Sequence, residues 1–421
     1  MVLEVFNRKL KRVFPVMVEG TFFKRVGVAW KQARTYVDRQ IGYQNRKILS
    51  NKTPVKKNQI MFITFQHDYA CNPKYICEEL LKEEAPVEIY WALNDVLNID
   101  KLPQNDNFHV VKINSYDYFK AAASSRAIVI NSLLGDKFYP FPVKKDQYVY
   151  ETWHGSLGIK RFDLSHYNTN MSWPVAAVRT GKLTNFCISN STFEEDVFRE
   201  TFWQTTPILR LGHARNDIFF DGYEEQRKKW KHAFLHERML PDDTKLALYA
   251  PTFRDTHNFA VYDLAPDMVI DALKKRFGGE WKLLLRYHDN DKKTEKSKNN
   301  VISPDVIDVT AMPDIQELLA YTDVGITDYS SWIYDFILSR RPGFIYARDI
   351  KLYNNERGFY FKLEESPFPV AKNNDQLYNN ILNFDKDSYL EKVQKFLDGK
   401  GCMDDGHASE RIAANIMKHM K

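Results

Sequence analysis

The sequence predicts an α/β protein with two domains, each a mainly parallel sheet covered by helices, behind a basic amphipathic helical N-terminal extension. Short apolar segments of strand length alternate with helix-like segments, which is the pattern of parallel α/β sheets. This alternation runs through the chain twice, with a break near residue 210. The 421 residues also exceed what one ordinary core accommodates. We therefore expect segment 1–55 to precede domains at 56–210 and 211–421.

The N-terminal segment holds most of the basic excess. Residues 1–50 contain eleven Lys and Arg against three Asp and Glu, whereas the whole chain carries a net charge of +5. Large apolar residues are interleaved with these cations, as in helices that lie in a lipid headgroup layer. We expect peripheral attachment to an anionic membrane surface. The alternative is a helical extension that docks on its own domain. A nucleic-acid arm is disfavoured, because residues 51–421 are net acidic.

Strands can be placed in order along both domains. The first domain is predicted to contain strands at 60–65, 87–93, 109–113, 127–131, 148–153 and 185–189. The second is predicted to contain strands at 245–253, 281–288, 306–312, 324–331 and 343–349, and the polar segment 289–300 is expected to be a loop. In open α/β sheets the ligand binds at the carboxyl ends of the strands. The polar residues that close these strands are therefore the candidates for a site.

Strand ends of the second domain share one chemistry. "YAPTFRD" supplies Thr252 and Arg254, "LLLRYHD" supplies Arg286 and His288, and "ITDYSSWIYDF" supplies Asp328, Ser330 and Ser331 at a helix start. Arginines, hydroxyls and helix N-termini are typical partners of phosphate groups. The second domain is thus expected to bind phosphate, although Asp and Ser are also the common N-caps of any helix.

Several classes of protein are excluded or disfavoured. No apolar run is long enough to span a bilayer, and no signal peptide is recognisable. The four cysteines form neither a CxxC pair nor a disulfide framework, which suits a cytoplasmic chain. No P-loop, no G-x-G-x-x-G after a strand and no zinc signature occurs, so we expect no cofactor and no metal. "DND" at 289–291 resembles a metal motif only formally.

The motifs then identify a family. "ETWHGSLGIKR", "LGHARND", "YAPTFRD", "LLLRYH", "TDYSSWIYDF" and "RRPGFIYARD" followed by "ERGFYF" occur between about residues 145 and 365. In order and spacing they resemble the CDP-glycerol glycerophosphotransferase family, the wall teichoic acid glycerophosphate and ribitolphosphate primases and polymerases. Two positions depart from the family pattern: Ala214 replaces a proline, and Ser156-Leu157 replaces Thr-Pro. Both departures bear on the acceptor side.

This resemblance implies a fold and an activity. The fold would be two Rossmann-like domains in a glycosyltransferase-B-like arrangement, with the acceptor at 56–210 and the CDP-linked donor at 211–421, which ends in C-terminal helices. The reaction would transfer glycerol phosphate from CDP-glycerol to a hydroxyl of a membrane-anchored, lipid-linked polymer precursor and release CMP. The enzyme would work at the cytoplasmic face of the bacterial cell membrane. CDP-ribitol is the competing donor.

His154 is the predicted general base. An alcohol attacks phosphorus once a base takes its proton, and an imidazole is poised for this at neutral pH. Trp153 and Gly155 flank it as substrate-binding candidates, and Gly155 and Gly158 would let an acceptor approach the backbone. Lys160 and Arg161 are expected either to attract acceptor phosphates or to form a solvated face. A hydrogen-bonded core histidine is the alternative role for His154.

The donor half carries the remaining candidates. His288 and Arg286, with Ser330 and Ser331, are expected to stabilise negative charge on the departing CMP phosphate. The resemblance implies donor-binding roles at three further positions, which are Arg215, Thr252 and Asp335. Asp335 could equally fix its neighbours. His67 and His213 near strand ends are weaker candidates.

Two other classes of function stay open. A glycosyltransferase of the same architecture would move a sugar but would leave the six motifs unexplained. A membrane-surface protein without activity would not need His154 and His288, and both are present.

Overall fold

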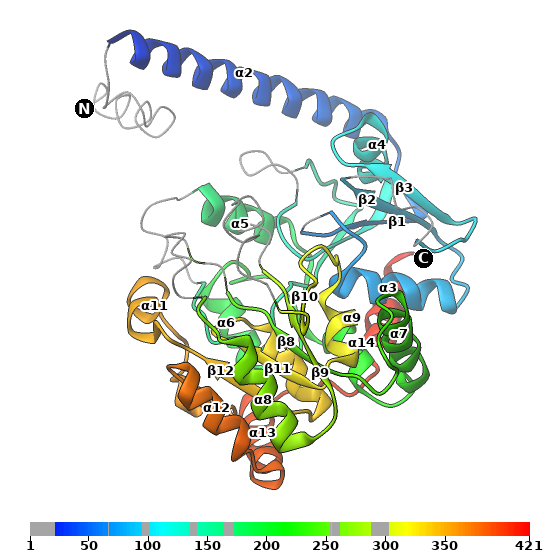
Figure 1. Ribbon diagram of the computed structural model, residues 1–421. Helices are drawn as coiled ribbons and strands as arrows, with labels where there is room; N and C mark the ends of the chain where they lie inside the picture. The colour runs from blue at the N-terminus through cyan, green and yellow to red at the C-terminus, as the bar shows by residue number, and fades with distance from the viewer. Residues whose placement is uncertain are drawn as a thin grey trace.

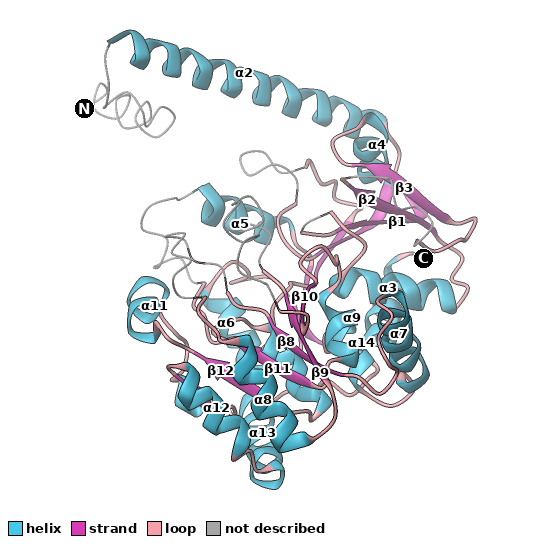
Figure 2. Ribbon diagram, in the orientation of Figure 1, coloured by secondary structure: helices cyan, strands magenta, loops and turns pink. Residues whose placement is uncertain are grey.

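The computed structural model describes residues 22–65, 67–94, 102–134, 141–162, 172–252, 254, 262–287 and 303–421. Two separate sheets form the body of the molecule, each flanked by helices, and a long helix projects from one end (Figures 1 and 2). The predicted α/β class with two parallel sheets is confirmed.

The first sheet has seven parallel strands in the order β3-β2-β1-β4-β5-β6-β7. Their bounds are β1 Lys56–Ile63, β2 Glu88–Leu93, β3 Phe108–Lys112, β4 Ser125–Ile130, β5 Tyr148–Glu151, β6 Phe186–Ser189 and β7 Ile208–Arg210. Most of their residues are buried, since helices cover both faces of a parallel sheet. The strand order reverses between β1 and β4, which is the point where open sheets bind ligands.

The second sheet repeats this plan with six parallel strands in the order β10-β9-β8-β11-β12-β13. Their bounds are β8 Lys245–Tyr249, β9 Trp281–Leu285, β10 Val306–Asp308, β11 Val324–Thr327, β12 Gly343–Tyr346 and β13 Val370–Ala371. The order reverses between β8 and β11. All eleven predicted strands are present, and the short β7 and β13 were not predicted.

Helices fill the connections between strands. Those of the first half are α3 Cys71–Lys82, α4 Tyr116–Ser124, α5 Ser172–Leu183 and α6 Thr192–Glu200. Those of the second half are η4 Ala214–Phe219, α7 Glu224–Glu237, α8 Pro266–Phe277, α9 Ile315–Tyr321, α10 Trp332–Phe336, η7 Ile337–Ser339, α11 Ile350–Arg357, η8 Leu363–Glu365, α12 Asn374–Leu382, α13 Lys386–Lys400 and α14 Ala408–His419. Several begin where a polar side chain accepts a bond from the first turn, as Ser115 Oγ does from Tyr118 N.

Helix α14 returns to the first half of the chain. It packs against α3 and η4, and the backbone carbonyl of His419 accepts a bond from Arg126 Nε at 2.9 Å. Its N-terminus is held by Asp217, whose carboxylate accepts bonds from the backbone N–H groups of Ala408 at 2.9 Å and Ser409 at 2.7 Å. Burial raises the pKa of Asp217 to about 6, although the bonds from Ser409 oppose this rise.

A buried ion pair joins the two halves. Lys74 Nζ of α3 lies 3.1 Å from Asp314 Oδ2, the N-cap residue of α9, and 2.5 Å from Glu317 Oε1. The Tyr75 hydroxyl donates to the same Asp314 oxygen at 3.2 Å. Removing one partner of such a pair leaves a buried charge uncompensated, so these residues fix the spacing of the two sheets.

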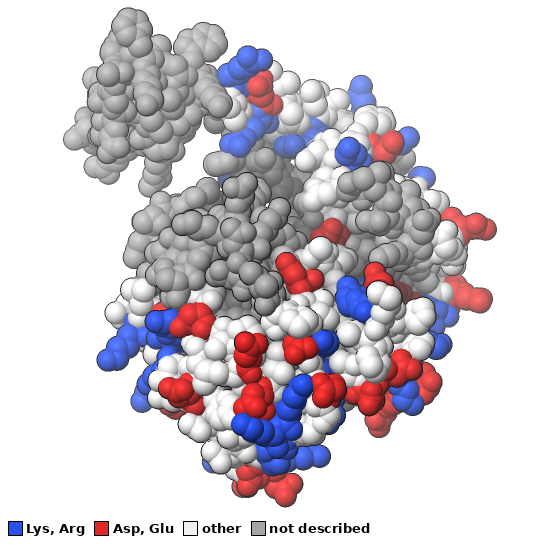
Figure 3. All heavy atoms as spheres, viewed as in Figure 1, with Lys and Arg blue, Asp and Glu red and all other residues white. Residues whose placement is uncertain are grey.

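The projecting helix is α2, Phe22–Lys52. Its last turns pack on α4, and the rest extends away from the sheets (Figure 1). Lys and Arg side chains line its described part at the top of the space-filling view (Figure 3). Residues 1–21 of the predicted extension lie outside the described residues. Within the described chain, no helix is both long enough and apolar enough to cross a membrane.

Candidate active site

His154 lies just after β5, at the switch point of the first sheet. Its Nδ1–H donates to the backbone carbonyl of Asn131, which follows β4, at 2.5 Å. Its ring stacks on Phe65, which follows β1, with centroids 5.0 Å apart. The bond to the carbonyl places the ring proton on Nδ1, because a carbonyl only accepts. In the neutral ring Nε2 then carries the lone pair, and this is the form that a general base needs.

The backbone beside His154 is bent sharply. Trp153 has a φ of 51°, in the left-handed region that residues with a Cβ rarely adopt. The Trp153 N–H donates to Glu151 Oε1 at 2.9 Å, and Asn72 Nδ2 donates to the carbonyls of Thr152 at 2.8 Å and Trp153 at 3.2 Å. These bonds hold the strained turn, which aims the next side chain away from the strand.

Aromatic packing holds the same turn from outside. The Trp153 indole lies in a cluster with Phe162, Phe198, Phe202 and Trp203. Trp153 is only 8% exposed, so the structure gives it a scaffold role beside His154. Glu151 is fully buried, and burial raises its pKa well above the ordinary range despite the bond from Trp153. When the Glu151 carboxyl is neutral, the turn contains no buried charge that would cost free energy.

The loop after His154 touches the second half of the chain. A Cβ on Gly158 would lie 2.9 Å from Ser331 Cβ, and one on Gly155 would lie 3.8 Å from Ser331 Oγ. Further along, Lys160 forms an antiparallel bridge with Phe359, and Tyr360 N donates to Ile159 O at 2.8 Å. The loop that follows the predicted base therefore lies against the predicted helix start at Ser331. Gly158 is required by this close approach.

Hydroxyls line the second-domain side. Ser330 and Ser331 follow β11 and are partly exposed directly before α10, and Ser331 makes no side-chain capping bond to this helix. Thr252 follows β8, so the switch point of the second sheet lies between these two segments. Its Oγ1 is buried and has no hydrogen-bond partner among the described residues. A ligand oxygen would satisfy it.

Arg254 and Asp328 bind each other. Arg254 Nη2 lies 2.8 Å from Asp328 Oδ2, and the guanidinium also contacts both carboxylate oxygens of Asp349 at 2.8 and 2.9 Å. Asp328 Oδ1 in turn accepts from the backbone N–H of Thr252 at 2.7 Å. Both side chains are nearly fully buried. They fix the strand ends that carry Thr252 and Ser330.

Arg215 and Asp335 form a second buried pair. Arg215 Nη2 lies 2.9 Å from Asp335 Oδ2, and Nε donates to the same oxygen at 3.1 Å. Asn72 Oδ1 accepts from Arg215 N at 3.1 Å, which links this pair to the turn before His154. Burial raises the pKa of Asp335, and the neighbouring Arg215 opposes that rise. The two predicted donor ligands are thus brought together and paired.

The other predicted residues divide into three cases. Arg286 donates to the carbonyls of Val309, at 3.4 Å, and Met312. His288, with the loop 289–300 and its "DND", lies outside the described residues. His213 is fully buried, with Nε2 2.9 Å from Glu194 Oε2, and Glu194 raises its pKa although burial alone would lower it. His213 is a structural residue.

Three residues that the sequence did not single out complete the arrangement. Asn131 fixes the tautomer of His154, Phe65 stacks on its ring, and Asn72 bonds to both Thr152 and Arg215. Phe65 and Asn131 each close a predicted strand, so strand-end position was the signal available for both. For Asn72, which lies in the first turn of α3, the sequence gave no such signal.

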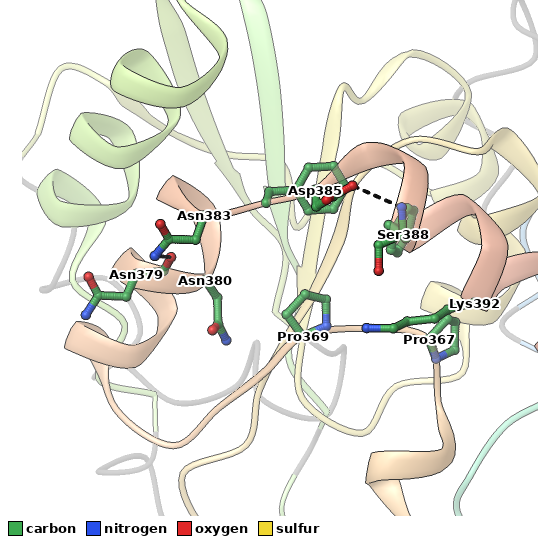
Figure 4. A pocket seen from close by; sticks show the side chains of 10 residues that line it. Pro367, Pro369, Asn379, Asn380, Asn383, Asp385, Ser388 and Lys392 are labelled. Atoms are coloured by element: carbon green, nitrogen blue, oxygen red, sulfur yellow. Dashed lines mark hydrogen bonds between the residues drawn. The ribbon is translucent and has the colours of Figure 1, made fainter.

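A cavity of about 230 Å³ lies far from this site, between α12 and α13 (Figure 4). Its polar side chains bond to nearby backbone: Asn380 Nδ2 donates to Val370 O at 3.1 Å, and Asp385 Oδ1 accepts from Ser388 N at 3.0 Å. These bonds serve the ends of α12, β13 and α13.

The fold and the site together define an α/β protein with two parallel sheets, whose candidate residues follow strands next to the two switch points. A UDP-N-acetylglucosamine 2-epimerase of Methanocaldococcus jannaschii shares this fold, with a TM-score of 0.50 and 12% identity over 86% of this chain and 99% of that chain.

The chain belongs to the CDP-glycerol:poly(glycerophosphate) glycerophosphotransferase family, whose model matches residues 46–418. It is 30% identical to the teichoic acid poly(glycerol phosphate) polymerase of Staphylococcus epidermidis over 387 residues, 87% of this chain and 51% of the relative. It is 28% identical to the teichoic acid glycerol-phosphate transferase of Staphylococcus aureus over 389 residues, 89% of this chain and 96% of the relative. The chain therefore spans about half the length of some of its curated relatives and nearly all of others.

Solved structures agree with this assignment. The wall teichoic acid polymerase TagF superposes with a TM-score of 0.74 and 27% identity, covering 95% of this chain and 99% of that chain. A variant of the same polymerase has been solved after a soak with CDPG, and it also superposes with a TM-score of 0.74.

Proposed function

We propose that the protein transfers glycerol phosphate from CDP-glycerol to a hydroxyl of a membrane-anchored teichoic acid or related polymer precursor and releases CMP. Family membership and the names of the relatives support this reaction. The observation that carries the proposal for this chain is the state of His154, whose Nδ1–H is bound to a carbonyl and whose Nε2 keeps its lone pair.

In the proposed step, His154 Nε2 takes the proton of the acceptor hydroxyl. The acceptor oxygen attacks the phosphorus that bears glycerol, a new P–O bond forms, and the bond from that phosphorus to the CMP oxygen breaks. Charge grows on the departing CMP phosphate, so groups that hold that charge accelerate the step. Ser330, Ser331 and Thr252 are the described hydroxyls for this role, and His288 and Arg286 are the proposed cationic partners.

Buried charges have a different role in this proposal. The pairs Arg254 with Asp328 and Arg215 with Asp335 position the strand ends rather than neutralise phosphate. Domains at 56–210 and 211–421 bind the acceptor and the donor, respectively. Gly155 and Gly158 let the loop after His154 approach Ser331 closely, which brings the acceptor side and the donor side together.

Segment 1–55 is proposed to hold the enzyme on the cytoplasmic face of the membrane. Three large apolar side chains on the outer surface of α2, Val37, Ile41 and Ile48, are 52 to 55% exposed. They recur at helical spacing and stand beside exposed Arg34 and Lys47, which is the mixture that binds anionic lipid surfaces. The inner surface of the same helix contacts the first domain.

The test is CMP release by the purified protein with CDP-glycerol, CDP-ribitol or a UDP-sugar, each with a lipid-linked glycerol phosphate acceptor. We expect CMP from CDP-glycerol and its loss in His154→Ala. Turnover of the UDP-sugar alone, or a fully active His154→Ala, would sink the proposal.

CDP-ribitol is the second candidate donor. Several relatives are named as ribitol-phosphate polymerases or primases, which supports testing it beside CDP-glycerol. Release of CMP from CDP-ribitol alone would keep the chemistry and change the donor.

A further inference from the structure

A cavity of about 530 Å³ lies between α2 and the carboxyl ends of the first sheet. Its walls come from segments far apart in the sequence: Arg39 and Arg46 from α2, His67 after β1, Phe119 from α4 and Leu133 after β4. Because α2 is part of the wall, the cavity exists only while this helix is docked.

Two polar atoms in this cavity lack partners. Within the described parts of the chain, Arg46 Nε and His67 Nδ1 are both buried without a hydrogen bond. The Arg46 guanidinium is held over the Phe119 ring, 5.4 Å from its centroid. A buried donor left unsatisfied costs about 1–3 kcal/mol. Arg46 Nε can only donate, so a ligand that meets it in this cavity must bring an acceptor oxygen.

The charge and the apolar walls define that ligand. Arg39 and Arg46 supply two positive charges against one carboxylate, Asp38, which also pairs with Arg34 at 3.9 Å. The rest of the wall includes Ile63, Ile113, Leu133 and the aromatic Tyr118 and Phe119. A phosphate group matches the arginines, and an apolar chain matches the remainder.

The cavity is next to the general base. Phe65, which stacks on His154, stands two residues before His67. Asn131, whose backbone carbonyl accepts the hydrogen bond from His154 Nδ1–H, stands two residues before Leu133. The two strand ends that hold His154 therefore also carry residues of the cavity wall.

We propose that this cavity binds the phosphate ester of the lipid-linked acceptor and so delivers its hydroxyl end to His154. Arg46 is the main phosphate ligand. This inference rests on the proposed function for the identity of the ligand as acceptor. That the cavity binds an alkyl phosphate does not depend on the proposed function.

The binding test titrates octyl phosphate, octyl glucoside or inorganic phosphate into the full chain, and calorimetry measures the binding. We expect octyl phosphate to bind more tightly than either control. Arg46→Met keeps the packing over Phe119 and removes the donors, and it should weaken octyl phosphate binding by about 10- to 100-fold, the size of a charged hydrogen bond. Arg39→Met should also weaken octyl phosphate binding.

Lys395→Met is the matched control, because Lys395 is exposed on α13, away from α2, and its loss removes the same charge. It should bind octyl phosphate as the wild type does. Circular dichroism checks that each variant keeps its fold. Equal binding by wild type and by both folded arginine variants, or no binding by wild type, overturns the cavity as a phosphate site.

A second measurement separates the acceptor from bulk phospholipid. CMP release is followed with the lipid-linked acceptor dispersed in detergent, where no bilayer is present. We expect Arg46→Met to raise the KM for the acceptor about tenfold or more and to change kcat little. An unchanged KM, or cavity-dependent binding to phosphatidylglycerol vesicles instead, overturns the acceptor as the ligand. If the wild type releases no CMP, the proposed function is wrong. The calorimetry then still tests whether the cavity binds an alkyl phosphate.

Discussion

The two halves of the site use polar residues differently. In the first domain, His154 is held through Nδ1 and through one ring face, and its side chain is partly exposed. In the second domain, Arg254 and Arg215 are buried against carboxylates. In the same half, Ser330 and Ser331 are partly exposed, and the buried Thr252 Oγ1 has no hydrogen-bond partner among the described residues.

This difference teaches how to interpret strand-end motifs. A charged motif residue that is fully buried has its charge neutralised inside the protein. It therefore contributes to binding by positioning the neighbouring residues that contact the ligand. A residue that is held by the scaffold but partly exposed can meet a substrate. Variants can test each side of this comparison.

The largest effect is expected from the base. His154→Ala should lower the rate of CMP release by about 100- to 10,000-fold, the usual contribution of a general base. Thermal unfolding should change little, because the side chain is only partly buried. His407→Gln is the control, since this histidine is 62% exposed on α14's N-terminal side. A rate in His154→Ala within a fewfold of wild type would contradict the assignment.

The next effect concerns Arg254. Arg254→Met leaves Asp328 and Asp349 buried without their cation, so the free energy of unfolding should fall by about 3–5 kcal/mol. Denaturant titration measures this change. Arg199→Met, an exposed change on α6, should leave stability within about 0.5 kcal/mol. If Arg254→Met were as stable as wild type and had lost only donor affinity, Arg254 would be a ligand rather than a scaffold.

Asp217 gives a pH dependence. Its folded pKa of about 6 lies above its unfolded value of 3.8, so its contribution to stability is present below pH 4 and is lost as the pH rises through 6. The shift corresponds to at most about 3 kcal/mol. Asp217→Asn cannot ionise. Relative to wild type it should therefore gain stability between pH 4 and pH 7, as measured by denaturant titration at each pH. A constant difference across this range would refute the ionisation.

The smallest effect is expected from a single hydroxyl. Thr252→Val removes an oxygen with no protein partner, so stability should be unchanged or slightly higher. If that oxygen bonds to the donor, the KM for CDP-glycerol should rise about 2- to 12-fold, one neutral hydrogen bond. Thr205→Val, at an exposed site, should change neither quantity. An unchanged KM for Thr252→Val would remove Thr252 from the donor site.

The strand pattern made the fold predictable, whereas the pairing of charged residues was not. Most predicted strands are apolar runs long enough to show a period, whereas β13 has two residues and β7 has three. Strand β10 also has three residues, but the predicted run 306–312 continues beyond it. The placement of His154 after a strand could be predicted from the run 148–153, and its role as a base stays a prediction. That Arg254 contacts Asp349 could not be predicted, since 95 residues separate them and only the packed sheet brings them together.

Helix α14 has a consequence for the order of folding. The hydroxyl of Tyr150 on β5 lies 2.7 Å from His419 Nδ1, although 269 residues separate them, and the rings of Tyr148 and Phe186 contact the same histidine. This part of the first sheet is therefore covered only once α14, the last helix of the chain, has come back to it. Contacts of such long range are expected to form late in folding, because closing a long loop costs entropy before its contacts form.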